Sequence, residues 1–220
     1  MIYAHETDWR KPSVHPLCVS YPPADTNSEA MRAYLDKRDL SFDLAVMNGW
    51  YESSCAGDDY PRVVIPAVTH VPGHAYWQAR DTTGKAYLRY QTPKGPRYEA
   101  LIQVLPLLDL KGTVIVEGPM DALAAAGAGY AGIALMGMTP GYSTIVQLTK
   151  LLDRHKPVFV LLDRDSNDNA HKLAIKLAGL GVNSKVIFLP GPEKDLAQCT
   201  KLKRRKFLVN ELLNSSNRRS

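Results

Sequence analysis

Four short apolar segments that alternate with helical patterns restrict the fold of this chain more than any other feature. The segments are Thr113–Glu117, Ile133–Leu135, Val158–Leu162 and Lys185–Leu189, and helical patterns cover Ala122–Ala126, Tyr142–Leu152 and Asn169–Leu180. Apolar strands separated by helices predict β–α–β units, in which helices cover both faces of a parallel sheet. We therefore predict an α/β fold for this half of the chain.

The rest of the chain divides into three parts with different patterns. Residues 1–27 are rich in Pro, Ser and His and predict an extended arm. Residues 28–110 predict a small basic β-rich subdomain, with a short helix after Ser28, strands over Arg62–Val68 and Ala75–Arg80, and a connecting helix over Tyr98–Leu108. Residues 111–200 hold the α/β unit, and residues 201–220 form a basic C-terminal helix or tail.

Composition excludes several classes of protein. The chain is 45% hydrophobic and 22% charged, an ordinary balance for a globular protein. Its three cysteines are far apart and form no CxxC pair, which predicts reduced thiols and no zinc site. No apolar run approaches the roughly 20 residues that span a bilayer, and the N-terminus has no apolar signal segment. We expect a cytoplasmic protein without a membrane partner.

Positive charge is concentrated at the C-terminus. The net charge is +5, and residues 201–220 carry seven basic residues against Glu211, so the rest of the chain is close to neutral. Four of these basic residues, Lys203, Arg204, Arg205 and Lys206, precede the apolar segment Phe207–Val209, which predicts a basic amphipathic helix. From charge alone, such a helix could bind a phosphate-rich partner or present a solvated face.

Carboxylates follow three of the predicted strands. Glu117 ends the first strand and Asp121 lies one turn later, Asp163 and Asp165 follow the third strand, and Asp195 follows the fourth. Each could be a turn former or a helix cap when considered alone. Together they lie where open α/β sheets bind ligands, and their mutual repulsion calls for a cation such as Mg²⁺. Residues 163 and 165, two apart on an extended segment, would point to the same side.

The motifs around these carboxylates resemble the TOPRIM domain of bacterial- and phage-type DNA primases. Val114–Leu123 resembles its first motif, Leu135–Thr139 its glycine loop, Val160–Asp165 its DxD motif and Phe188–Asp195 its lysine–aspartate element. The resemblance covers about Thr113 to Gln198. A weaker resemblance to the basic subdomain that precedes TOPRIM in primases rests on Arg62–Pro66, Gly73, Ala79–Arg80, Lys85–Leu88 and Lys94–Tyr98.

The resemblance implies a role for each matching residue. Glu117 would be the acid/base or metal-polarising carboxylate, with Asp163 and Asp165 also catalytic. Mg²⁺ or Mn²⁺ would be bound by Glu117, Asp121, Asp163, Asp165 and Asp195. Template or nucleotide would be positioned by Arg62, Arg80, Lys85 and Lys94, whereas Arg89 and Arg97 are expected on the solvated surface.

The family resemblance implies a primase catalytic core without its usual accessory domains. Neither a zinc ribbon nor the GxxxxGK[ST] motif of a helicase is present in the sequence. We therefore expect a core that makes RNA primers from NTPs on single-stranded DNA, together with a replicative helicase or a separate zinc module. A TOPRIM-type nuclease would use the same carboxylates, and a non-catalytic DNA-binding replication adaptor would use only the tail; both remain alternatives. In a primase core, the basic helix that begins at Lys203–Lys206 could clamp single-stranded DNA or dock on a helicase, and we favour the clamp.

Overall fold

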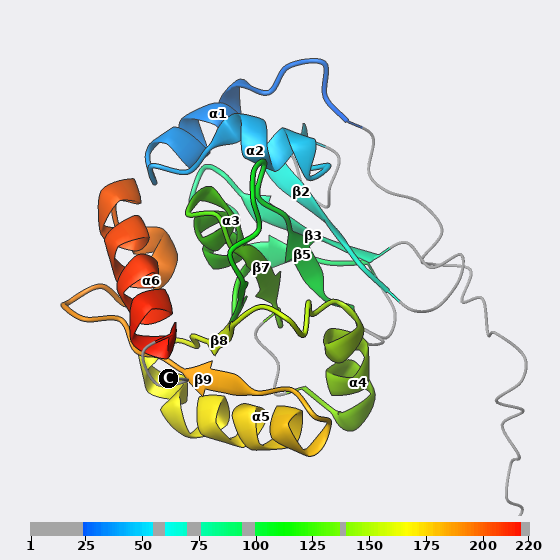
Figure 1. The fold of residues 1–220 in the computed structure, drawn as a ribbon. Helices are drawn as coiled ribbons and strands as arrows, with labels where there is room; N and C mark the ends of the chain where they lie inside the picture. Colours follow the sequence, from blue (N-terminus) through cyan, green and yellow to red (C-terminus); the bar gives the residue numbers. More distant parts are fainter. Residues whose placement is uncertain (1–23, 55–59, 70–75, 94–99, 137–139, 217–220) are drawn as a thin grey trace, which may run out of the picture.

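A computed structural model describes residues 24–54, 60–69, 76–93, 100–136 and 140–216 of the chain. Most of the predicted arm over residues 1–27, and the loop that carries Lys94 and Arg97, lie outside these ranges. The described chain folds into two β-sheets with helices packed around them (Figure 1). Within these ranges, no helix combines the length and the hydropathy needed to cross a bilayer.

The larger sheet has five strands in the order β5-β7-β6-β8-β9. Their bounds are Ile102–Val104 for β5, Thr113–Val116 for β6, Ala131–Ala134 for β7, Val158–Val160 for β8 and Ser184–Val186 for β9. β6 runs parallel to β7 and β8, and β8 runs parallel to β9. This sheet confirms the predicted α/β class, and its parallel strands bring the ends of β6 and β8 to one edge.

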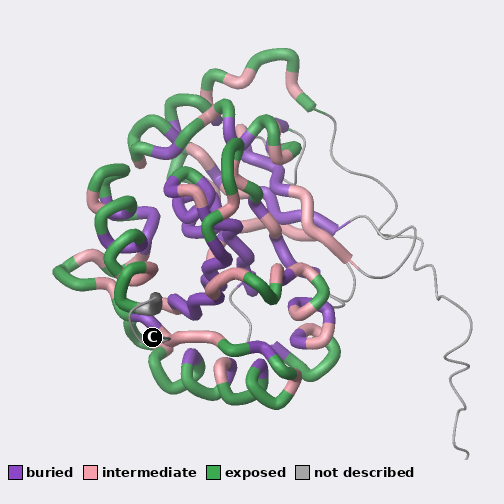
Figure 2. Tube along the Cα trace, in the orientation of Figure 1, coloured by how far each residue is buried: buried purple, intermediate pink, exposed green. Residues whose placement is uncertain are grey.

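Helices cover both faces of this sheet. α3 (Pro119–Gly127) and α6 (Lys201–Ser216) belong to one side, and α4 (Tyr142–Lys150) and α5 (Asn167–Gly179) to the other (Figure 1). Successive residues of β6 point to opposite faces, so Val114 and Val116 join the core around α3 while Ile115 joins the core under α4 and α5. β6, β7 and β8 are accordingly buried on both faces (Figure 2), as their continuous apolar sequences predict.

Gly132 allows α3 to pack directly on β7. A Cβ atom at this position would lie 2.1 Å from the carbonyl oxygen of Ala122 and 2.4 Å from its Cα. No side chain larger than hydrogen fits there unless the helix backbone moves. The close contact holds the N-terminal turn of α3, and with it Asp121, against the sheet.

The predicted connecting helix over Tyr98–Leu108 is wrong. Residues 102–104 form β5, which pairs antiparallel with β7 in the register Ile102↔Ala134 and Val104↔Gly132. Leu101, Ile102 and Val104 are fully buried and divide between the two cores. Pairing with a distant strand determines the conformation of this short apolar run, which local periodicity cannot detect. The five-stranded sheet thus takes one strand from upstream of residue 111.

The smaller sheet confirms the predicted β-rich unit. Its strands are β1 (Tyr51–Ser53), β2 (Arg62–Ala67), β3 (Tyr76–Asp81) and β4 (Tyr90–Gln91), all antiparallel and in sequence order. Tyr76 and Trp77 of β3 are almost fully buried. An antiparallel bridge between Val68 and Leu101 connects this sheet to the segment that leads into β5.

One continuous core joins the two sheets. α1 (Glu29–Asp36) is the helix predicted after Ser28, and α2 (Phe42–Met47) follows it. α1 contributes Met31 and α2 contributes Leu44 to the same cluster as Ile65 of β2, Met120 of α3 and Phe207 of α6. The helix predicted at the C-terminus is confirmed as α6. Because these elements share a core, the end of α1 and the small sheet are held opposite the strand ends of the large sheet.

Candidate active site

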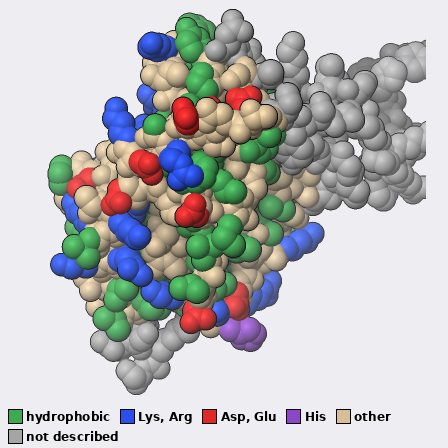
Figure 3. All heavy atoms as spheres, turned by 90° about the horizontal axis from the view of Figure 1, so that it is seen from above, with side chains coloured by type: hydrophobic (Ala, Val, Ile, Leu, Met, Phe, Trp, Pro, Cys, Tyr) green, Lys and Arg blue, Asp and Glu red, His purple; other side chains and the backbone are tan. Residues whose placement is uncertain are grey.

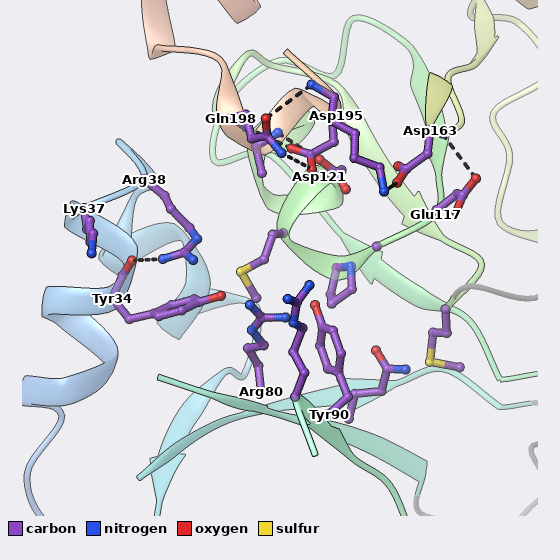
Figure 4. A pocket seen from close by; sticks show the side chains of 18 residues that line it. Tyr34, Lys37, Arg38, Arg80, Tyr90, Glu117, Asp121, Asp163, Asp195 and Gln198 are labelled. Atoms are coloured by element: carbon purple, nitrogen blue, oxygen red, sulfur yellow. Dashed lines mark hydrogen bonds and ion pairs between the residues drawn. The ribbon is translucent and has the colours of Figure 1, made fainter. Parts of the chain in front are cut away.

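A cavity of about 710 Å³ lies between the strand ends of the large sheet, the end of α1 and one face of the small sheet. Its walls carry opposite charges (Figure 4). The large sheet and its loops contribute the carboxylates Glu117, Asp121, Asp163 and Asp195. The facing wall contributes the cations Lys37, Arg38, Arg80 and Arg89.

Glu117 and Asp163 meet at the ends of two neighbouring strands. Glu117 directly follows β6, and Asp163 follows β8 after two further apolar residues. The backbone N–H of Asp163 donates a hydrogen bond of 3.2 Å to Oε1 of Glu117. Burial, together with the charge of Glu117, raises the pKa of Asp163. Parallel pairing of β6 with β8 therefore produces the convergence that the sequence predicts for these two residues.

Asp121 is the most deeply buried of the four carboxylates. It lies in the first turn of α3 and is 8% exposed, and its Oδ1 accepts a hydrogen bond of 2.8 Å from the backbone N–H of Ala197. Burial and then the nearby charge of Asp195 raise its pKa to about 8, although the Ala197 hydrogen bond acts in the opposite direction. Without a cation in the cavity, Asp121 holds its proton at neutral pH.

Asp195 both caps a short helix and lines the cavity. It precedes the 3₁₀ helix η2 (Leu196–Gln198), and its side chain accepts hydrogen bonds of 2.9 Å from the backbone and from the side-chain amide of Gln198. The sequence left open whether Asp195 caps a helix or belongs to the site. The structure shows that it does both. The cap fixes the carboxylate beside Asp121.

Asp165 does not join the carboxylates of the cavity. The chain turns at Asp163 into the 3₁₀ helix η1 (Arg164–Ser166), so the prediction that 163 and 165 point to the same side of an extended segment is wrong. The side chain of Asp165 is 76% exposed. Nζ of Lys194 lies 3.2 Å from Oδ2 of Asp163 and 4.0 Å from Oδ2 of Asp165, and thus links the two carboxylates.

The loop that carries Lys194 and Asp195 is held by a basic residue of the DxD motif. The guanidinium of Arg164 donates hydrogen bonds to the carbonyl oxygens of Leu189, Gly191 and Glu193. These bonds place Lys194 over Asp163, where the two carboxylates raise its pKa. Sequence reasoning included Lys194 only as part of a motif and assigned no role to Arg164.

Two cations of the facing wall, Arg38 and Arg80, lie against aromatic rings. The Arg38 guanidinium lies 3.8 Å from the centroid of the Tyr34 ring, and the Arg80 guanidinium lies 4.8 Å from the Tyr90 centroid and 5.7 Å from the Tyr34 centroid. Within the described ranges, none of the four cations of this wall forms an ion pair with a carboxylate. The wall therefore presents uncompensated positive charge to the cavity.

The sequence identified only Arg80 of this facing wall. Arg89 was assigned to the solvated surface but lines the cavity. Tyr34 belongs to α1, and Arg38 to the turn that follows it. Periodicity predicts the helix but does not indicate what the end of the helix faces. Only the shared core brings that end to the cavity, so no local signal could have identified these residues.

Two of the other predicted nucleotide- or template-binding residues lie elsewhere. Arg62 is fully buried in β2 and donates hydrogen bonds to the carbonyl oxygens of Ala79 (3.2 Å) and Leu88 (3.0 Å), which contradicts the prediction that it contacts nucleotide or template. A buried guanidinium needs such acceptors, and the strand backbone supplies them. Lys85 is exposed in the β3–β4 loop and does not line the cavity, and Lys94 lies outside the described residues.

The basic segment of α6 is only partly available to a partner. Arg204 is 3% exposed and donates hydrogen bonds to the carbonyl oxygens of Leu196, Ala197, Arg38 and Asp39, so its assignment to a DNA clamp is wrong. Lys203 pairs with Glu193. Arg205 and Lys206 are exposed. Lys and Arg side chains gather toward the left of the face drawn in Figure 3.

The donor atoms of the acidic wall suit a hard divalent cation. All are carboxylate oxygens, and burial, followed by repulsion from neighbouring carboxylates, raises the pKa of both Asp121 and Asp163. In the described part of the chain, no three potential ligands are arranged closely enough to hold one ion as they stand. Binding would require side-chain movement, including that of Lys194.

Comparison with protein families identifies the domain around the acidic wall. Residues 114–200 match a family described as Toprim-like, so this part of the chain is a Toprim-like domain. A search of curated proteins finds no significant match.

Solved primase structures share the overall fold. The Aquifex aeolicus primase (zinc-binding and RNA polymerase domains) has a TM-score of 0.61 at 20% identity over 86% of this chain, which spans only 56% of that protein's chain. A DnaG primase catalytic domain bound to single-stranded DNA has a TM-score of 0.60 at 17% identity, covering 87% of this chain and 75% of that one. The primase fragment of the bacteriophage T7 primase-helicase has a TM-score of 0.55 at 17% identity, with coverages of 81% and 73%. The chain thus has the fold of a DnaG-type primase catalytic core.

Proposed function

We propose that this chain is the catalytic core of a DNA primase and synthesises short RNA primers on single-stranded DNA with Mg²⁺ or Mn²⁺. The observation that carries the proposal is the cavity in which four carboxylates face four cations that have no counter-ion among the described residues. A nucleoside triphosphate with its divalent cations would neutralise both walls at once. The proposal is also in keeping with the fold of solved primases.

The cationic wall is suited to hold the triphosphate. Arg80 and Arg89 project from the small sheet and its loop and Arg38 from the end of α1, so phosphate oxygens between them would receive hydrogen bonds from two directions. Stacking on Tyr34 and Tyr90 restricts the guanidinium groups of Arg38 and Arg80 before any ligand binds. Orientation of this kind favours in-line attack by a primer hydroxyl on the α-phosphate.

The acidic wall is suited to hold the divalent cations. Glu117, Asp121, Asp163 and Asp195 would be the ligands, and Asp165 would join them if Lys194 moved away. When bound, Mg²⁺ would neutralise triphosphate charge and acidify the attacking hydroxyl. Asp121 would release its proton as the cation binds, because a positive charge beside it would oppose the rise in pKa that burial and Asp195 cause. Lys194 would then be free to contact phosphate.

Single-stranded DNA and a helicase are the partners that the solved relatives suggest. One related structure is a primase domain bound to single-stranded DNA, and another belongs to a primase-helicase. Template contacts are proposed for Lys85, which does not line the cavity, for Lys94, and for Arg205 and Lys206 on α6. A separate zinc module would supply recognition of the template sequence.

A gel assay with labelled NTPs, single-stranded templates and Mg²⁺ or Mn²⁺ tests the proposal. Short products should appear with the wild-type chain and should disappear with Asp163→Asn and Asp165→Asn. Asp168→Asn, an exposed carboxylate of α5 away from the cavity, is the matched control and should keep full yield. Degradation of the template would support a nuclease, and template binding without products in the presence of a helicase and zinc module would support an adaptor.

A further inference from the structure

Three polar atoms of the cationic wall have no hydrogen-bond partner in the described part of the chain. They are the hydroxyl of Tyr34, Oε1 of Gln78 and Nε of Arg80. Tyr34 and Gln78 are each 6% exposed, and all three residues line the cavity. Buried polar atoms without partners are rare in folded proteins, because they lose their hydrogen bonds to water without replacement. Three of them on one wall indicate a polar ligand.

The chemistry of these atoms specifies what part of a ligand they bind. Oε1 of Gln78 can only accept a hydrogen bond, so it cannot bind a phosphate oxygen, which also only accepts. Nε of Arg80 can only donate, and the Tyr34 hydroxyl can do both. A hydroxyl group that donates to Gln78 and accepts from Tyr34 would satisfy both unpaired atoms.

The spacing of Gln78 and Arg80 indicates that the sugar of a nucleotide lies beside Gln78. The two residues are two apart on β3, so their side chains lie on one face of the sheet and about 7 Å apart. If the phosphates bind at Arg80, the group beside Gln78 is the one joined directly to them. In a nucleotide that group is the sugar, whereas exocyclic amines lie at the far edge of the base.

The Tyr34 ring is held in place for this role. Arg38 stacks on the ring at 3.8 Å from its centroid, and its Nη1 also donates a hydrogen bond of 3.2 Å to the Tyr34 carbonyl. Figure 4 shows the Tyr34 side chain pointing from α1 toward Arg80. The hydroxyl is therefore positioned by the protein before a ligand binds.

We propose that Tyr34 and Gln78 form a subsite for the ribose 2′-hydroxyl and select ribonucleotides over deoxyribonucleotides. The inference rests on the proposed function, since it assigns the phosphates to Arg80. It adds two specificity residues, from α1 and β3, to the wall that already carries Arg38 and Arg80.

Calorimetric binding of ATP, dATP, UTP and dUTP in Mg²⁺ tests the subsite in the full chain. Tyr34→Phe removes only a hydroxyl, and Gln78→Leu removes only the amide. Each should weaken ATP and UTP binding by about three- to tenfold, the loss expected for one hydrogen bond, and leave dATP and dUTP within twofold. Tyr142→Phe on α4 and Gln91→Leu on β4, which do not line the cavity, are matched controls and should change nothing.

The outcomes separate this inference from the proposed function. Equal losses for ribo- and deoxyribonucleotides would overturn the subsite, because the residues would then bind phosphate or support the fold. A loss confined to ATP and dATP would assign the pair to the base amine and would also overturn it. Primer synthesis by the wild type would stand in both cases. A folded wild type that binds no nucleotide would refute the proposed function itself.

Discussion

Replacing Asp121 with asparagine probes the electrostatics of the acidic wall directly. The substitution preserves the shape of the side chain and the oxygen that accepts the hydrogen bond from Ala197. It removes only the ability to carry a negative charge. Because the carboxyl group is buried beside Asp195 and Asp163, we expect the variant to be more stable than the wild type at high pH in the absence of metal.

The size of the effect follows from the pKa of Asp121. That pKa is about 8 in the folded chain, against 3.8 for an unperturbed aspartate. The protonated carboxyl stabilises the folded chain fully below about pH 4, and this stabilisation is lost as the pH rises toward 8, because the unfolded chain releases the proton first. At about 1.4 kcal/mol for each pKa unit, the difference in free energy of unfolding reaches roughly 6 kcal/mol.

Thermal unfolding followed by circular dichroism in EDTA, between pH 4 and pH 8.5, measures this difference. The melting temperatures of wild type and Asp121→Asn should agree near pH 4. At pH 8 and above they should differ by roughly 12–24 °C, at about 2–4 °C for each kcal/mol in a chain of this size. Asp168→Asn controls for the loss of an exposed charge and should follow the wild type. Parallel curves for wild type and Asp121→Asn would refute the assignment of Asp121 as a buried, charge-repelled carboxyl.

Three further predictions follow from the packing and from the loops. Gly132→Ala should lower the free energy of unfolding, measured by urea denaturation, by about 2–3 kcal/mol, because the new Cβ meets the backbone of Ala122. A change below about 1 kcal/mol would show that α3 can shift. In Arg164→Lys, the shorter side chain should not reach the carbonyl groups of Leu189, Gly191 and Glu193. Amide hydrogen exchange across residues 189–195 should therefore accelerate while the melting temperature stays the same. Unchanged exchange would mean that other contacts hold the loop. Charge reversal of Arg205 and Lys206 should reduce the slope of log affinity for single-stranded DNA against log salt by about 1.4 in magnitude, because each phosphate that a cation neutralises on a single strand accounts for about 0.7. An unchanged slope, with loss only of helicase-stimulated synthesis, would instead assign α6 to protein docking.

The sequence alone was sufficient to predict the α/β unit and the position of its carboxylates. β6, β7 and β8 are short apolar runs, β9 overlaps the predicted run Lys185–Leu189, and the helices between them have their own periodicity. These signals are local, because burial on both faces of a parallel sheet leaves few polar positions in a strand. The order of the segments then places Glu117 and Asp163 at one edge, as the structure has them.

Only the tertiary structure decided which basic residues face the cavity. Arg62 and Arg204 have the same local context as surface cations, but backbone carbonyl groups from distant segments surround them. β5 likewise depends on pairing with β7, and its apolar residues fit a helix equally well in sequence. Tyr34 and Arg38 reach the site because α1 packs into a core shared with α3. Burial and long-range pairing depend on the whole fold, whereas the strand-end carboxylates depend on residues adjacent in the chain.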